Sequence, residues 1–327
     1  MKPRDIPEDL LELEVLTSRL KQRFKGKNLI ADEAARQRAG YNGEKSIDYF
    51  LTFLDKKAYS ILNYLRLCDE HGAFQLDTLI LTPSFILNIE VKHVSGKIVF
   101  DSMKQAVRTN TDGESQYFNP LDQVHLQRLR LHKWLMNHGF PKLPIVNLIV
   151  YTNSNCILLN NTDDPLVRKT VIRKESLISK IQELTQIHQK KMMKQEQFQH
   201  LITTLINKHT PLKRDLMGEF GVKVNHLRQG VICIECSGSP MKWNRGKWFC
   251  AFCKNISNDA HINALYDYSM LINTEITNRQ AREFLQIEGT RIMHRLLKNM
   301  NLPEVGKTSD RKYNLAEFRQ REMKKRM

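Results

Sequence analysis

The sequence predicts a mixed α/β protein, and three observations lead to this. Two short apolar runs, Thr78–Leu81 and Phe85–Ile89, flank a Thr-Pro-Ser turn and predict a β-hairpin. Apolar residues at helical spacing occur on both sides of that hairpin in the sequence. Two Cys-x-x-Cys pairs near the C-terminus indicate a separate small module. We therefore expect a mixed sheet flanked by helices, followed by smaller C-terminal units.

The hairpin brings together residues with a shared chemistry. Asp77 stands at the head of the first run, and the second run ends in Glu90-Val91-Lys92. Glu90 and Lys92 are two positions apart, so on a strand they point to the same face. Two carboxylates with the Val91 carbonyl form an oxygen-rich set suited to Mg²⁺ or Mn²⁺. An exposed Glu–Lys pair that closes an ordinary strand is the open alternative.

The neighbouring segments complete one predicted domain over residues 40–160. Helices are expected to open at Gly40–Glu44 and at Asn119–Gln123, the second running to about Asn137. Residues 101–118 are polar and predict a loop over the site. Further strands are predicted at Tyr59–Leu67, Gly96–Phe100, Pro144–Tyr151 and Cys156–Leu159.

The ordered series Gly43-Glu44, Leu76-Asp77, Glu90-Val91-Lys92 and Asn119-Pro120-Leu121-Asp122-Gln123 resembles the nuclease-related domain. That family (NERD) is a branch of the PD-(D/E)xK nuclease superfamily, and the resemblance covers about residues 35–155. One departure is Leu76, where the superfamily has Pro. The resemblance implies a restriction-endonuclease-like fold, and it implies that Glu44 and Gln123 assist Asp77, Glu90 and Lys92 in metal-dependent catalysis. Their alternative roles are a charge at a helix N-terminus for Glu44 and first-turn capping for Gln123.

Composition narrows the class of partner. Among 327 residues there are 51 Lys and Arg against 35 Asp and Glu, giving a net charge of +16. Such an excess points to a polyanionic partner, most simply nucleic acid, with an inert basic surface as the alternative. We expect DNA, and RNA stays open. No run approaches the ~20 apolar residues that span a bilayer, and no signal peptide is visible, so a cytoplasmic location without membrane contact is expected.

The cysteine pattern predicts a structural metal site. Cys233 and Cys236 form one Cys-x-x-Cys knuckle, Cys250 and Cys253 form another, and turn formers with two Trp lie between them. Four thiolates complete a tetrahedral Zn²⁺ site, which predicts a zinc ribbon over residues 231–256. Four sulfur ligands leave no open coordination position, so this zinc is structural rather than catalytic.

The remaining segments are predicted to be helical. Residues 1–39 form an N-terminal arm with a basic patch at Lys21–Lys27, and residues 161–230 form a linker. Residues 257–327 resemble a helix-turn-helix, or winged-helix-like, unit with a basic second helix carrying Arg291, His294, Arg295 and Lys298. A helical hairpin packed on the ribbon is the alternative.

These features together predict a Mg²⁺- or Mn²⁺-dependent DNA nuclease whose C-terminal units hold the nucleic acid. No GxxxxGK[ST] motif is present, which argues against ATP-driven translocation. The alternative is a DNA-binding or adaptor protein in which the nuclease-like domain is not catalytic. The oligomeric state, including a homo-oligomer, is left open.

Overall fold

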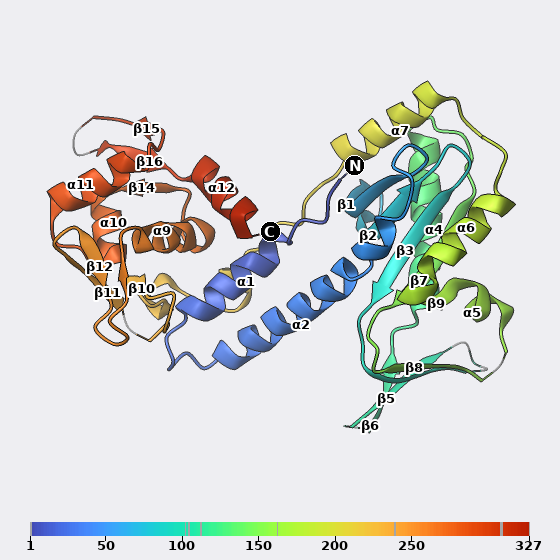
Figure 1. The fold of residues 1–327 in the computed structure, drawn as a ribbon, viewed down its shortest axis with the longest axis horizontal. Coiled ribbons are helices and arrows are strands. Elements are labelled where there is room, and N and C mark those ends of the chain that lie inside the picture. The colour runs from blue at the N-terminus through green and yellow to red at the C-terminus, as the bar shows by residue number, and fades with distance from the viewer. Residues whose placement is uncertain are drawn as a thin grey trace. The chain divides into compact units, whose positions relative to one another are not determined.

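The computed structural model describes residues 2–101, 103, 105–111, 113–161, 163–238, 240–307 and 310–326. The chain forms two compact units (Figure 1). The first unit comprises Met1–Asp5 and Gln37–Leu212, and the second comprises Ile6–Arg36 and Lys213–Met327.

A five-stranded mixed sheet forms the centre of the first unit. Its strand order is β1-β2-β3-β7-β9, in which β1, β2 and β3 are antiparallel and β3, β7 and β9 are parallel. The strands are β1 (Ser60–Asp69), β2 (Gly72–Leu81), β3 (Ile86–Lys92), β7 (Ile145–Tyr151) and β9 (Val171–Arg173). The expected hairpin is confirmed, since Thr82 closes the turn with its backbone N–H and side-chain hydroxyl on the Phe85 carbonyl.

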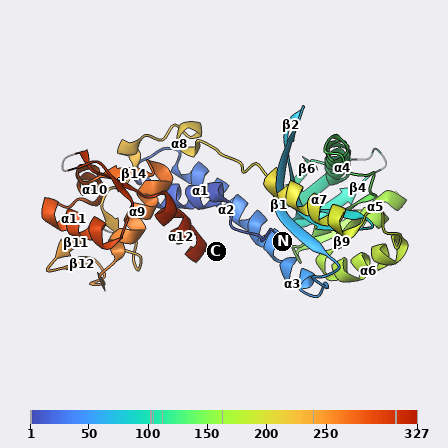
Figure 2. The ribbon, with the colours of Figure 1, turned by 90° about the horizontal axis from the view of Figure 1, so that it is seen from above.

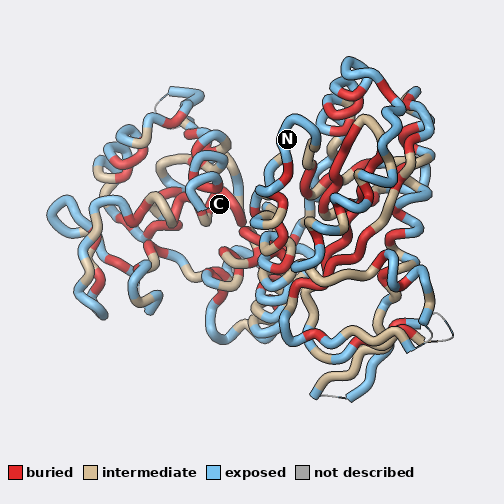
Figure 3. Tube along the Cα trace, turned by 45° about the vertical axis from the view of Figure 1, so that its right-hand side comes forward, coloured by how far each residue is buried: buried red, intermediate tan, exposed pale blue. Residues whose placement is uncertain are grey.

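Helices cover both faces of this sheet. On one face, α4 (Pro120–Asn137) and α7 (Gln195–Asn207) enclose an apolar core with β1, β2 and β3. On the other face, α3 (Asp48–Leu51) and α6 (Leu177–Ile187) pack on Leu87, Ile89 and Val91. Figure 2 shows α4 and α6 on opposite sides of the strands, and Figure 3 shows the strands largely buried. The alternating residues of β3 therefore serve two different layers.

A second sheet lies beside the first and corrects one expectation. Its order is β6-β5-β4-β8, with β4 (Gly96–Phe100), β5 (Ala106–Asn110), β6 (Gly113–Tyr117) and β8 (Cys156–Asn160). The prediction of a loop over 101–118 is wrong, because β5 and β6 form a hairpin there. The inward residues Phe100 and Ala106 are buried, but most of β6 is exposed, so apolar patterning gave no signal. Helix α5 (Pro165–Thr170) adjoins this core through Val167.

The segment before the sheet also differs from expectation. Helix α2 (Lys27–Lys45) runs through Gly40 and Gly43 and ends one residue after Glu44. The prediction that a helix opens at Gly40–Glu44 is therefore wrong, and a separate short helix, α3, begins at Asp48. Glu44 lies at a helix C-terminus, where a carboxylate is disfavoured by the helix dipole. The alternative role of Glu44 as a charge at a helix N-terminus is therefore wrong.

The second unit contains helices and two small sheets. Helix α1 (Glu8–Arg19) packs on α9 (Ala260–Leu271), where the buried Arg19 guanidinium donates to Asp267 at 2.7 Å. The four cysteines lie in the connections between strands of one sheet, β10-β11-β12-β13, and the other sheet, β14-β16-β15, adjoins α10. The bounds are α8 (Leu216–Glu219), β10 (Val231–Ile232), β11 (Pro240–Asn244), β12 (Lys247–Phe249), β13 (Ile256–Ser257), β14 (Glu275–Thr277), α10 (Asn278–Leu285), α11 (Thr290–Asn299), β15 (Glu304–Val305), β16 (Lys312–Asn314) and α12 (Ala316–Arg326).

The mixed α/β prediction is confirmed by this arrangement of sheets and helices. Thr277 caps α10 by accepting from the Gln280 N–H. In the part of the chain that the structure describes, no helix combines the length and apolar character needed to cross a bilayer.

Candidate functional site

The candidate site lies where β2 and β3 separate. The last paired residues of these strands are Thr78 and Ile89, so the next pair in this register, Asp77 and Glu90, is released from the ladder. Beyond this point β3 continues beside β7, with Glu90 opposite Ile149. In place of a ladder bond, the Val91 N–H donates to the Asp77 Oδ2 at 2.9 Å. Asp77 is thus fixed at the edge of a gap between two strands.

Glu90 and Lys92 extend from the same face of β3, as the two-residue spacing predicted. The Lys92 Nζ donates to the Glu90 Oε1 at 2.7 Å and to the Gln123 Oε1 at 2.8 Å. The Gln123 Nε2 in turn donates to the Glu90 Oε1 at 2.6 Å. Gln123 lies in the first turn of α4, which Asn119 caps by accepting from the Leu121 N–H, so the helix start aims the amide at the strand.

Buried amides hold the other side of the Glu90 carboxylate. The Gln127 Nε2 donates to the Glu90 Oε2 at 2.9 Å and also to the Gln75 carbonyl at 3.1 Å. The Asn88 Nδ2 donates to the Gln127 Oε1 at 2.9 Å. Glu90 is 4% exposed and Gln127 is 7% exposed, so water cannot replace these bonds at low cost. The orientation of Glu90 is therefore set by α4 as much as by its own strand.

Arg4 joins the N-terminal segment to the same site. Its guanidinium donates to the Glu44 Oε2 at 2.7 Å and to the Asp48 Oδ1 at 3.0 Å. It also donates to the Asn63 Oδ1 at 3.0 Å and the Thr78 Oγ1 at 2.6 Å. The Arg4 side chain is only 1% exposed. It is a buried cation that links a helix end to the first two strands.

Tyr64 has a backbone conformation that is uncommon for a residue with a side chain. Its φ is 50°, in the left-handed region, and the β1–β2 ladder omits the pair of Tyr64 with Asp77. The Tyr64 side chain hydrogen-bonds to Glu44, and the Arg4 guanidinium lies 5.3 Å from the Tyr64 ring centroid. Strain of this kind costs roughly 1–3 kcal/mol and often marks functional sites.

Gly43 allows the helix to approach the strand that carries Glu90 and Lys92. A Cβ at position 43 would lie 2.2 Å from the His93 Cβ, which no real contact allows. Only a glycine therefore fits here, and the next residue, Glu44, is brought beside Tyr64 and Arg4. His93 itself bonds through Nδ1 to the Thr152 Oγ1 at 2.9 Å, on the flank of the site.

The carboxylates repel one another in this partly dry setting. Burial raises the pKa of Asp77 well above its usual range, and Glu90 and Glu44 raise it further. Burial also raises the pKa of Glu44 to about 7, although Arg4 and the Tyr64 hydroxyl oppose the shift. For Lys92, burial acts to lower the pKa, but the Glu90 carboxylate outweighs it and the net pKa is raised. Lys92 is therefore an ammonium at neutral pH.

The donor set fits a hard divalent cation. Asp77, Glu90 and Glu44 offer carboxylate oxygens, and a bound cation would relieve the repulsion that raises the pKa of Asp77. Mg²⁺ in proteins usually takes one or two carboxylates and keeps several waters. Among the described residues, only the four cysteines place three or more such ligand atoms within 4.8 Å of one another. Glu44 thus does not complete a compact triad with Asp77 and Glu90.

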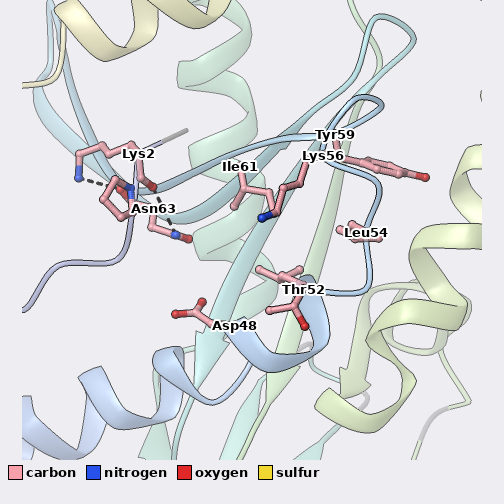
Figure 4. A pocket seen from close by; sticks show the side chains of 10 residues that line it. Lys2, Asp48, Thr52, Leu54, Lys56, Tyr59, Ile61 and Asn63 are labelled. Atoms are coloured by element: carbon pink, nitrogen blue, oxygen red, sulfur yellow. Dashed lines mark hydrogen bonds between the residues drawn. The ribbon is translucent and has the colours of Figure 1, made fainter. Parts of the chain in front are cut away.

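A cavity of about 400 Å³ adjoins the Arg4 network (Figure 4). Its apolar lining includes Leu51 and Leu54 after α2 and Ile61 on β1. Figure 4 shows the Asp48 carboxylate and the Lys56 side chain at this cavity. Asp48 is also bonded to Arg4, so the cavity and the carboxylate cluster share one residue.

The four cysteines of the second unit form a compact cluster. All four Sγ atoms lie within 4.8 Å of one another, and the Cys233–Cys253 and Cys236–Cys250 pairs are each 3.6 Å apart. A tetrahedron with Zn–S bonds of about 2.3 Å has edges of about 3.8 Å, so the spacing suits one ion. Backbone hydrogen bonds from Cys253 and Phe252 help lower the pKa of Cys250 to about 6, which favours the thiolate. The cluster supports the predicted metal binding.

Comparison with known proteins supports the nuclease-related assignment for the first unit. Residues 39–152 match the family model of NERD, the nuclease-related domain. This stretch contains Glu44, Asp77, Glu90, Lys92 and Gln123. No curated protein and no solved structure matches the chain. The family match covers about a third of the sequence and does not extend to the second unit.

Three residues of the site were missed from the sequence. Gln127 had a visible signal, because it follows Gln123 by four positions and so lies on the same helix face. Tyr64 had none, because its apolar strand context hides a backbone irregularity. Arg4 also had none, because its partners are 40 to 74 residues away in the chain.

Proposed function

We propose that this protein is a divalent-metal-dependent nuclease that hydrolyses phosphodiester bonds in DNA. The observation that carries the proposal is the convergence of Asp77, Glu90 and Lys92 where β2 and β3 separate. The family match over residues 39–152 supports a nuclease-related role for the same residues. The antiparallel–parallel sheet with helices on both faces supports a restriction-endonuclease-like fold.

Asp77, Glu90 and the Val91 carbonyl would hold the Mg²⁺ or Mn²⁺ ion. When bound, the ion lowers the pKa of its water and neutralises charge on the phosphoryl oxygens. Tyr64 and Arg4 already hold the Glu44 carboxylate. Glu44 would therefore accept a hydrogen bond from a water near the ion and would not bind the ion directly. Gln127 fixes the Glu90 carboxylate from behind.

Lys92 acts as a cation in this proposal. Its raised pKa keeps the ammonium protonated, which disfavours a role as general base. A protonated Lys92 can hold a scissile phosphate oxygen and stabilise the charge that develops there. Gln123 accepts from the ammonium through its Oε1 and donates to the Glu90 Oε1 through its Nε2, so it holds the two charged groups in place.

The second unit is proposed to hold the nucleic acid. The four-cysteine cluster would bind a structural Zn²⁺ that stabilises the small ribbon. The order α9–β14–α10–α11–β15–β16 supports a winged-helix-like unit. Arg291, His294, Arg295 and Lys298 are exposed on α11, while Met293, Leu296 and Leu297 face the core. These exposed side chains would contact DNA phosphates.

Plasmid cleavage tests the proposal. Supercoiled DNA is incubated with the protein and Mg²⁺ or Mn²⁺, and nicked or linear products are measured on gels. Wild type is expected to cleave, while Asp77→Ala and Lys92→Ala abolish cleavage without loss of folding. Glu196→Ala, which removes an exposed carboxylate from α7, is the matched control and should cleave normally.

A non-catalytic DNA-binding role is the second candidate. It is favoured by one observation, since both Glu90 oxygens already accept bonds from the protein itself. This role would be established if the protein binds DNA in a salt-dependent way but does not cleave it with either Mg²⁺ or Mn²⁺, and if the Asp77 and Lys92 variants bind equally well. That result would refute the nuclease proposal.

A further inference from the structure

A basic notch lies on the second unit, and none of its residues belongs to the ribbon (residues 231–256) or to α11. It is formed by Lys21, Arg23, Phe24 and Lys25, which connect α1 to α2, and by His226. We call these five residues the basic notch. Its volume is about 370 Å³, which is enough for a nucleobase and its phosphate.

The basic notch is held in shape by the backbone. The Lys21 N–H donates to the His226 carbonyl at 3.0 Å, and the Phe24 N–H donates to the Lys21 carbonyl at 3.1 Å. The Lys21 Nζ donates to the Asn225 carbonyl at 2.7 Å. These bonds fasten the connection between α1 and α2 to the turn that carries His226. The site is therefore built in advance of a ligand rather than formed by a free loop.

The aromatic rings of the basic notch lie close together. The Phe24 and His226 ring centroids are 5.0 Å apart, with an interplanar angle of 42°. Gly26 allows this position, because a Cβ there would lie 2.9 Å from the Phe24 ring. Phe24 is only half-buried, so part of its ring is accessible. An accessible ring with a fixed position is a platform on which a planar group can stack.

The charge of the basic notch is uniformly positive. No Asp or Glu is among its lining residues. Arg23 and Lys25 are exposed, and neither has an ion-pair partner among the residues that the structure describes. Two unneutralised cations beside an aromatic ring match a phosphate joined to a base.

We propose that the basic notch binds single-stranded nucleic acid, with a base stacked on Phe24 and the flanking phosphates held by Arg23 and Lys25. A single strand is required, because the faces of bases in a duplex are already stacked on their neighbours. The inference goes beyond the proposed nuclease activity and does not depend on it. It adds a preference for unpaired strands that the carboxylate cluster alone does not provide.

Binding of the full-length protein to labelled oligonucleotides tests the inference. Fluorescence anisotropy is measured without added divalent cations for an oligo-dT strand and for a duplex of equal length, over a series of salt concentrations. Phe24→Leu keeps an apolar side chain but removes the aromatic face. It is expected to weaken single-strand binding by about fivefold to 150-fold, as base–aromatic stacking predicts, and to leave duplex binding unchanged.

A matched pair of double variants separates the basic notch from general charge. Arg23→Ala with Lys25→Ala should reduce the slope of log K against log salt by about 1.4, or about 0.7 for each phosphate that the protein no longer neutralises. Lys213→Ala with Lys324→Ala removes the same charge from exposed positions of the same unit outside the notch, and should leave the slope unchanged. Thermal unfolding of every variant confirms that it is folded.

Three results would overturn the inference. One is wild-type affinity of the folded Phe24→Leu protein for the single strand. Another is an equal decrease of slope in the two double variants. The third is failure of wild type to bind the single strand at low salt. Loss of plasmid cleavage in the Asp77 variant has no bearing on these outcomes, so the two proposals fail separately.

Discussion

Replacement of Arg4 by Ala should destabilise the first unit substantially. The Arg4 side chain is 1% exposed and bonds to two carboxylates and two polar side chains. Its removal leaves Glu44, which is 15% exposed, without its cation, and leaves the buried Asn63 and Thr78 oxygens with only the hydrogen bond between them, at 3.1 Å. Breaking a buried ion pair typically costs about 3–5 kcal/mol. Asp48 is 35% exposed and solvent screens it, so we expect the lower part of that range.

The loss of folding stability caused by Arg4→Ala should depend on pH. The pKa of Glu44 is raised to about 7 in the folded protein, so its carboxyl is mostly neutral at pH 5 and mostly ionised at pH 8. A raised carboxyl pKa favours the folded state at low pH, and that stability is lost as pH rises through 7. Arg4 offsets this loss because it stabilises the ionised form. The Arg4→Ala protein should therefore lose more stability at pH 8 than at pH 5.

Thermal unfolding followed by circular dichroism measures both effects. For a domain of this size, 1 kcal/mol corresponds to about 2–4 °C, so about 3 kcal/mol lowers the Tm of the first unit by roughly 6–12 °C at pH 8. Arg128→Ala removes an exposed guanidinium from α4 and serves as the control. A change of less than about 2 °C for Arg4→Ala, or an equal change at both pH values, would refute the reasoning.

Three further predictions concern the site and the second unit. Gln127→Leu should lower the cleavage rate about 10- to 100-fold, because the Glu90 carboxylate loses the amide that orients it. Leu126→Ala, at an exposed position of the same helix, should cleave at the wild-type rate. Steady-state kinetics compare the two variants, and equal rates would contradict the role assigned to Gln127. Cys236→Ser should abolish stoichiometric zinc binding, measured by mass spectrometry, and unfold the ribbon, followed by Trp243 and Trp248 fluorescence. A folded variant that still binds one zinc ion would contradict this prediction. Burial lowers the pKa of His261 to about 4, so the unfolded state binds a proton at this residue before the folded state does. The second unit should therefore lose up to about 3 kcal/mol of stability as pH falls from 6.5 to 4. Denaturant titrations should show a smaller dependence of stability on pH for His261→Gln, and an unchanged dependence would contradict this prediction.

The predictable parts of the site are those that local spacing controls. Glu90 and Lys92 meet because alternate residues of one strand share a face, and Gln123 joins them because Asn119 and Pro120 fix the start of α4. The cysteine cluster follows from the geometry of two short knuckles. In each case the contact is set by a few residues close together in the chain.

The parts that escaped prediction depend on contacts across the fold. Gly40 and Gly43 suggested a helix boundary, yet α2 continues through both of them. Gly43 is needed for a different reason, because the helix passes too close to His93 for any side chain. The hairpin of β5 and β6 is held by backbone pairing and has few apolar residues to reveal it. Arg4 reaches partners on α2, α3, β1 and β2, a long-range arrangement that no local pattern encodes.

The most direct test of the central claim is a crystal structure of the protein soaked in Mn²⁺, with anomalous diffraction recorded at the manganese edge. The account predicts an anomalous peak bound by Asp77, Glu90 and the Val91 carbonyl, with the Lys92 ammonium beside it, and no such peak in an Asp77→Ala crystal. A fully ordered site that takes up no manganese at saturating concentration, in crystals whose cysteine cluster holds its own metal, would contradict the account.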